Sequence, residues 1–148
     1  MSSANSFLRT FADRRQCIAE LLELSQRQLD LVESEDYSRL LSLLGGKQQI
    51  ISRLEAITSG RPRLWDDWRA ERDRLAPRDR QACEQTLAET EALLARLLEQ
   101  ERVSTETLAR RRDHTARELQ SVTAGSRVNQ AYGDSLAPVT HRFLDRGQ

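Results

Sequence analysis

Glycine, proline and aromatic residues are scarce in this sequence of 148 residues, which has six glycines, three prolines and 5% aromatic residues. Hydrophobic residues make up 38% of the chain and charged residues 31%. A sheet protein needs more turn-forming and aromatic residues than this, whereas a helical bundle does not. The composition therefore predicts an all-α protein with a thin core.

The sequence also lacks a net charge, because 23 basic residues balance 23 acidic residues. No net basic field draws the protein onto nucleic acid or an anionic membrane, so we expect its partner to be another protein. Arg110, Arg111 and Arg112 form the densest basic run, but acidic residues surround them at helical spacing. We interpret the run as an ordinary charged helix face.

Catalytic, metal and cofactor motifs are missing. Cys17 and Cys83 are too far apart for a Cys-x-x-Cys motif, and His114 and His141 accompany neither of them. Gly45-Gly46-Lys47 lacks the upstream glycine and the following hydroxyl residue of a phosphate-binding loop. We predict no enzymatic activity, no catalytic residue, no metal and no cofactor, with both cysteines as buried or half-buried free thiols.

The N-terminus has no basic segment followed by an apolar core, and no apolar run approaches the length that spans a bilayer. We therefore expect a cytoplasmic protein without stable membrane insertion.

Two helices are predicted in the first 60 residues. Residues 4–32 carry a heptad stripe that only Arg15 and Ser25 interrupt, and this stripe consists of Ala4, Leu8, Phe11, Ile18, Leu22, Leu29 and Val32. Ser34 or Asp36 is suited to cap a second helix that begins near Tyr37 and ends at Gly60. The short joint favours an antiparallel hairpin.

Gly45 and Gly46 fall inside the second helix, where each costs roughly 1 kcal/mol relative to alanine. We expect either a bend that serves as a hinge or a close-approach point for a partner, or a weak spot that the neighbouring leucines brace. The second interpretation is favoured.

Trp65 and Trp68 follow the Pro62 loop and lie three residues apart, on one side of a short helix. They form either a lid that closes the end of the bundle, which we favour, or an exposed aromatic anchor for a partner.

A third long helix is predicted from about Ala76 to Val122, with Pro77 in its first turn. Its stripe consists of Leu87, Leu94, Leu98, Leu108, Leu119 and Val122, but polar residues repeatedly interrupt it: Glu91, Glu101, Thr105, Arg112 and Thr115. The distal half should pack less tightly than the proximal half.

The character of the chain changes after residue 124. Five apolar residues recur at intervals of three or four residues, but Gly133 and Pro138 interrupt any continuous helix, and the five are Val128, Tyr132, Leu136, Val139 and Phe143. We expect a helical bundle over residues 1–124 and a loosely structured tail over residues 125–148. This tail either folds on binding a partner or is a mere terminal extension.

Three segments of the predicted hairpin resemble a known family. They are Leu21-Leu22-Glu23-Leu24, residues 35–41 and residues 43–54, and the Leu-Leu-x-x-Lys-Gln element at 43–48 is the best local match. They resemble the first hairpin of FlgN-type flagellar export chaperones. The likeness extends loosely through the third helix and includes a similar ending around Tyr132-Gly133.

The resemblance implies a helical cytoplasmic protein without catalytic activity or cofactor. Such a protein holds hook-filament junction proteins and delivers them to the flagellar type III export apparatus. It also implies that the tail and the distal third helix receive the protein client, and the residues we expect to bind it are Leu119, Val122, Val128, Tyr132, Leu136, Val139 and Phe143.

The expected fold is thus an elongated antiparallel helical hairpin plus a long third helix, as a bundle or coiled coil with a loose C-terminal tail. The alternative function is that of a structural coiled-coil subunit or stalk in a secretion or cytoskeletal assembly, in which the same stripes join chains permanently. An enzyme regulator or nucleic-acid adaptor is a third class. The sequence leaves the oligomeric state open.

Overall fold

The computed structural model describes the backbone of residues 3–136 and the side chains of residues 3–125. It contains four α-helices and one 3-10 turn over this range, and no strand. In chain order they are α1 (Ser3–Glu33), α2 (Tyr37–Gly60), α3 (Leu64–Glu71), η1 (Arg72–Arg74) and α4 (Pro77–Leu136). The predicted all-α fold is confirmed.

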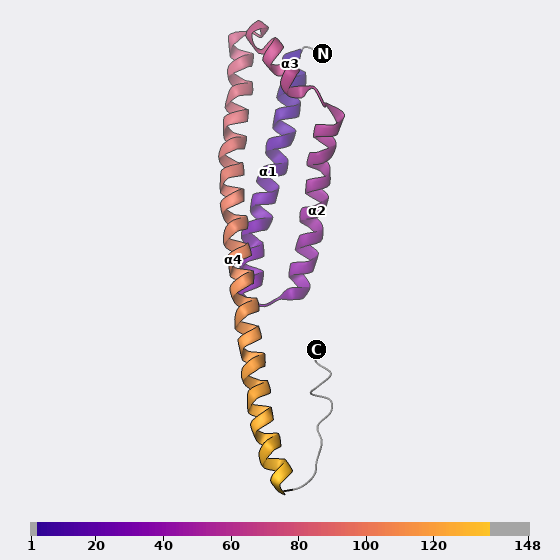
Figure 1. Cartoon of the computed structure of the whole chain (residues 1–148). Helices are drawn as coiled ribbons and strands as arrows, with labels where there is room; N and C mark the ends of the chain where they lie inside the picture. The colour runs from indigo at the N-terminus through magenta and orange to yellow at the C-terminus, as the bar shows by residue number, and fades with distance from the viewer. Residues whose placement is uncertain (1–2, 137–148) are drawn as a thin grey trace. The chain divides into compact units, whose positions relative to one another are not determined.

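The chain divides into two compact units, Met1–Thr107 and Leu108–Gln148, and α4 contributes to both. Within the first unit, α1 and α2 form the predicted antiparallel hairpin, and α3 connects the end of α2 to the start of α4 (Figure 1). The first part of α4 then runs alongside α1, to which an ion pair joins it: Arg15 Nη1 lies 2.7 Å from Glu89 Oε2.

Local signals set the helix boundaries. Asp36 caps α2 by accepting a hydrogen bond from the backbone N–H of Arg39 at 3.2 Å, and Pro77 is the first residue of α4. Gly60 is the last residue of α2, but it has no positive φ, and the cap is Arg61, whose N–H bonds to Thr58 O. The predicted glycine cap is therefore a simple helix end.

An aromatic core occupies the end of the first unit where α1, α3 and α4 meet, and its buried residues are Phe7, Phe11, Leu64, Trp68 and Cys83. The ring of Trp68 packs edge-on against the rings of both Phe7 and Phe11, with centroid distances of 5.3 and 5.2 Å. Only 5% of Trp68 is exposed, whereas 43% of Trp65 is exposed. Trp68 closes the bundle as a lid does, and Trp65 lies at its surface.

A second apolar core joins α1, α2 and α4 further along the bundle. Its buried residues are Ile18, Leu21, Leu22 and Leu97, and Ile50, Ile51, Leu54 and Leu93 pack against them. Each fully buried large apolar side chain contributes about 1.5–3 kcal/mol to folding. Because the cores contain few such side chains, the bundle depends on every contact they make.

The helix α4 extends to Leu136, beyond the end predicted near Val122. Gly125 and Gly133 lie inside it, because a single glycine costs a helix only about 1 kcal/mol and does not stop it. The loosely structured tail expected from residue 125 is thus helical as far as Leu136.

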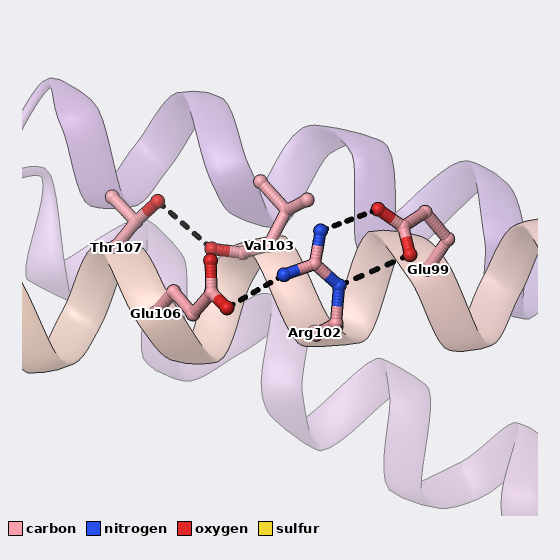
Figure 2. A network of polar contacts seen from close by, with 5 residues as sticks. All are labelled: Glu99, Arg102, Val103, Glu106 and Thr107. Atoms are coloured by element: carbon pink, nitrogen blue, oxygen red, sulfur yellow. Dashed lines mark hydrogen bonds and ion pairs between the residues drawn. The ribbon is translucent and has the colours of Figure 1, made fainter.

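The distal part of α4 packs loosely, as predicted: every residue from Arg112 to Gly125 is exposed. Before this stretch, ion pairs within the helix support α4. Figure 2 shows the Arg102 guanidinium between Glu99 and Glu106, to which it lies 2.6 Å on each side. These contacts raise the pKa of Arg102 and lower that of Glu99. They connect successive turns of the helix without using the core.

The helix α2 runs unbroken through Gly45 and Gly46. A Cβ added to Gly45 would meet nothing within 4 Å, and one added to Gly46 would lie 3.8 Å from Leu24 Cδ1, an ordinary contact. No close approach of another backbone requires glycine at either position. This geometry favours the weak-spot interpretation.

We expect Gly45→Ala to raise the free energy of unfolding by about 1 kcal/mol, because alanine loses less backbone entropy than glycine in a helix interior. Urea unfolding followed by circular dichroism measures this change. Gly60→Ala is the matched control, since it also meets open space but lies at the helix end, where the gain should be smaller. A Gly45→Ala variant that is less stable than the wild type would contradict the continuous helix.

Candidate functional site

The seven predicted partner-binding residues fall into three groups, which differ in how much of each residue the structure describes. Leu119 and Val122 lie on α4 in the second unit, with 63% and 64% of their surfaces exposed. Val128, Tyr132 and Leu136 also belong to the backbone of α4, beyond the described side chains. Val139 and Phe143 lie outside the described residues.

Helix geometry arranges the five helical positions in two rows. Leu119 and Val122 are three residues apart and therefore neighbours, and Val128, Tyr132 and Leu136 follow one another at intervals of four. Leu119 and Val128 are separated by nine residues, which is about two and a half turns, so these two positions lie on opposite sides of α4. A partner that contacts all five positions has to wrap partway around the helix.

Polar and charged side chains accompany the first row. His114 Nε2 lies 3.0 Å from Glu118 Oε1, and Arg112 Nε lies 3.7 Å from Asp113 Oδ1. All four side chains are largely exposed, so these pairs form a solvated rim beside the apolar positions. Exposed apolar residues with a charged rim are typical of a protein-binding surface.

A buried polar cluster in the first unit was not predicted from the sequence. Lys47 of α2, the only lysine in the chain, donates hydrogen bonds to Gln28 Oε1 at 2.7 Å and to Glu101 Oε1. Ser25 Oγ also donates to Glu101 Oε1, at 2.5 Å. The cluster therefore links α1, α2 and α4 through a single carboxylate.

The two charges of this cluster differ in their access to water. The side chain of Lys47 is 10% exposed, whereas that of Glu101 is 36% exposed. Burial disfavours the charged form of Glu101, but the hydrogen bonds from Lys47 and Ser25, together with the charge of Lys47, outweigh it and lower the pKa of Glu101. The carboxylate is therefore ionised near neutral pH and neutralises the buried ammonium group.

Ser104 lies three residues after Glu101 on α4 and is buried, yet its hydroxyl has no hydrogen-bond partner among the described residues. A buried hydroxyl without a partner costs about 1–3 kcal/mol. This unpaired polar position lies just before the first unit ends at Thr107.

The sequence contained a signal for this cluster. Lys47 interrupts the apolar stripe of α2, and Glu101 interrupts the apolar stripe of α4. Opposite charges at core positions of two neighbouring helices indicate a buried pair. Sequence analysis treated Glu101 only as a break in the stripe, because the partner of a core charge depends on how the helices align.

The cysteines fit the prediction of buried free thiols, since Cys17 and Cys83 are both buried and unpaired. Burial raises the pKa of each thiol, which keeps it protonated. In the part of the chain that the structure describes, no three His, Cys, Asp or Glu side chains are grouped to hold a metal ion. Across the same residues, no helix combines the length and apolar character needed to cross a bilayer.

We expect Glu101→Gln to destabilise the protein more than Lys47→Met. Removing the carboxylate leaves a buried ammonium without a counter-charge and should cost about 2 kcal/mol. Removing the lysine leaves a carboxylate that water reaches, and methionine fills the space with apolar contacts, so the loss should stay below about 1 kcal/mol. Urea unfolding at neutral pH compares the two, and equal losses would contradict the asymmetric burial.

The stability should also depend on pH through Glu101. Its pKa is lower in the folded protein than its ordinary value of 4.5, so its contribution is fully present above that value and is lost as the pH falls through the folded pKa. We expect the free energy of unfolding to fall below about pH 4.5, and to fall less steeply in Glu101→Gln. If the free energy of unfolding fell equally steeply with pH in the wild type and in Glu101→Gln, Glu101 would not be the titrating group.

Comparison with known proteins identifies the family. No curated protein and no solved structure matches the chain. A family model described as FlgN protein matches residues 1–138, which include all the described helices. The chain therefore belongs to the FlgN family, whose general role is that of a flagellar export chaperone that binds a protein client.

Proposed function

We propose that this protein is a cytoplasmic export chaperone that binds flagellar hook-filament junction proteins and delivers them to the flagellar type III export apparatus. Membership of the FlgN family supports the chaperone role. The observation that carries the binding mode is the exposure of Leu119 and Val122 on a helical stretch in which every residue from Arg112 to Gly125 is exposed.

Binding at this stretch needs no chemical step. A client that covers Leu119 and Val122 removes their apolar surface from water, which contributes about 1–2 kcal/mol for each side chain. The second row, at Val128, Tyr132 and Leu136, extends the proposed surface around α4. An amphipathic client segment held in this way is masked from self-association until it is handed over.

The exposed pairs at the rim of the proposed surface should contribute little to client affinity. The pairs Arg112–Asp113 and His114–Glu118 are exposed, so salt screens them readily. Because the main contribution comes from apolar contact, we expect client affinity to change little with moderate salt. Affinity that collapses with moderate salt would indicate an electrostatic mode instead.

The proposal predicts that Leu119→Ser combined with Val122→Ser weakens client binding at least tenfold, because two apolar contacts are lost. Titration calorimetry with the purified hook-filament junction proteins of the source bacterium measures the affinity. Both residues are exposed, so the thermal unfolding of the first unit should not change.

The matched control is Leu41→Ser, which removes a leucine that is 71% exposed on α2 and is not part of the proposed surface. It should bind the client as the wild type does. Equal affinity of the double variant and the wild type would contradict the proposed surface. A stable oligomer that recovers the same coiled-coil partner with and without residues 125–148 would favour a structural role.

A further inference from the structure

A second surface lies in the first unit, at the aromatic end of the bundle. There α1, α3 and α4 surround a groove of about 240 Å³. The groove is lined by Arg14, Trp65, Leu87, Thr90, Glu91 and Leu94. Trp65 and Leu94 are both partly exposed, so the groove presents apolar surface to the solvent although the aromatic core beneath it is closed.

Arg14 is the unusual member of this groove. Its guanidinium lies over the ring of Trp65, with its central carbon 4.9 Å from the ring centroid. Burial lowers the pKa of Arg14, and no hydrogen bond or ion pair joins it to any described residue, Glu91 included. The guanidinium is thus partly desolvated and has no acceptor from the protein, while its nitrogens still reach water.

Two other arginines show how this bundle normally satisfies such a group. Arg15, the next residue on α1, pairs with Glu89 at 2.7 Å. Arg61 also stacks on an aromatic ring, that of Phe7, but its Nη1 donates hydrogen bonds to Ser6 Oγ at 3.0 Å and Thr10 Oγ1 at 3.3 Å. Arg14 has the stacking partner without an acceptor.

The missing acceptor defines the chemistry of a ligand. The N–H groups of a guanidinium lie in its plane, and their fork matches the two oxygens of a carboxylate. A carboxylate would therefore supply the hydrogen-bond acceptor that Arg14 lacks. Trp65 and Leu94 beside it offer contacts to a large apolar side chain from the same ligand.

We propose that this groove docks an amphipathic helix of the protein client, in which a glutamate or aspartate lies one helical turn from a large apolar side chain. The carboxylate pairs with Arg14, and the apolar side chain packs against Trp65 and Leu94. Residues three or four apart on a helix are neighbours, which suits a short groove between helices. The client assignment rests on the proposed function, but the groove is separate from Leu119 and Val122.

A pair of synthetic helices tests the groove directly. One carries leucine and glutamate four residues apart, and the other carries lysine in place of the glutamate. In a Trp68→Phe variant, Trp65 is the only tryptophan, so its emission reports the groove. We expect the acidic helix to shift this emission to shorter wavelength and the basic helix to leave it unchanged, and titration calorimetry on the wild type repeats the comparison without a core substitution.

Variants of the groove sharpen the test. Arg14→Gln should weaken binding of the acidic helix at least tenfold and remove the preference for acid over base. Arg15→Gln is the matched control, because it removes a neighbouring arginine from a surface ion pair and should leave binding unchanged. Leu94→Ser should also weaken binding, whereas Leu98→Ser, one turn further along α4, should not. Equal binding of both helices by the wild type and Arg14→Gln would overturn the proposal.

Binding of the full junction protein to the variants distinguishes this inference from the proposed function. If the junction protein binds the wild type, loses affinity in Arg14→Gln and retains it in Arg15→Gln, the groove is a client site. If only Leu119→Ser/Val122→Ser weakens binding, the groove proposal fails and the proposed function stands. If no junction protein binds, the proposed function fails, and binding of the acidic helix alone would overturn the client as occupant. An emission shift with protein concentration alone would indicate a second copy instead.

Discussion

The contact between Lys47 and Glu101 is the constraint on which the alignment of the bundle depends. There the carboxylate of Glu101, on α4, accepts hydrogen bonds from both α1 and α2. A shift of α4 by one residue would rotate Glu101 by about 100° around the helix axis and leave the buried ammonium alone. The pair therefore fixes the register in which Leu97 reaches the apolar core of α1. An apolar pair at the same place would hold the helices together but permit sliding.

Much of this fold follows from the sequence because its signals are local. Asp36 caps α2 and Pro77 begins α4, and both act on backbone groups within one turn. The end of α4 was predicted too early, because Gly125 weakens a helix without ending it. The Lys47–Glu101 pair and the Arg14 groove could not be derived, since each joins residues more than 50 positions apart whose proximity depends on helix alignment.

The two tryptophans lie one turn apart on a short helix, yet Trp68 is buried in the core and Trp65 lies at the surface. Trp68 faces Phe7 and Phe11 and closes the aromatic core, whereas Trp65 stacks on Phe11 and Arg14 with much of its ring in water. Sequence spacing placed both on one side of α3, and packing then divided their roles. A small bundle with a thin core uses most of its large side chains to stay folded. Those left at the surface, Trp65 among them, therefore stand out as candidate contacts for a partner.

The length of α4 gives the exposed helix a property that a separate helix of the same sequence would lack. An isolated helix must first fix several residues for a single hydrogen bond, and this nucleation step makes short helices unstable in water. In α4 the first turns form on the packed bundle, so the stretch after Thr107 needs only propagation, which is nearly neutral in free energy for each added residue. The bundle therefore nucleates the distal helix, whose own residues add little to its stability. Small changes in contact along it can lengthen or shorten the helical segment.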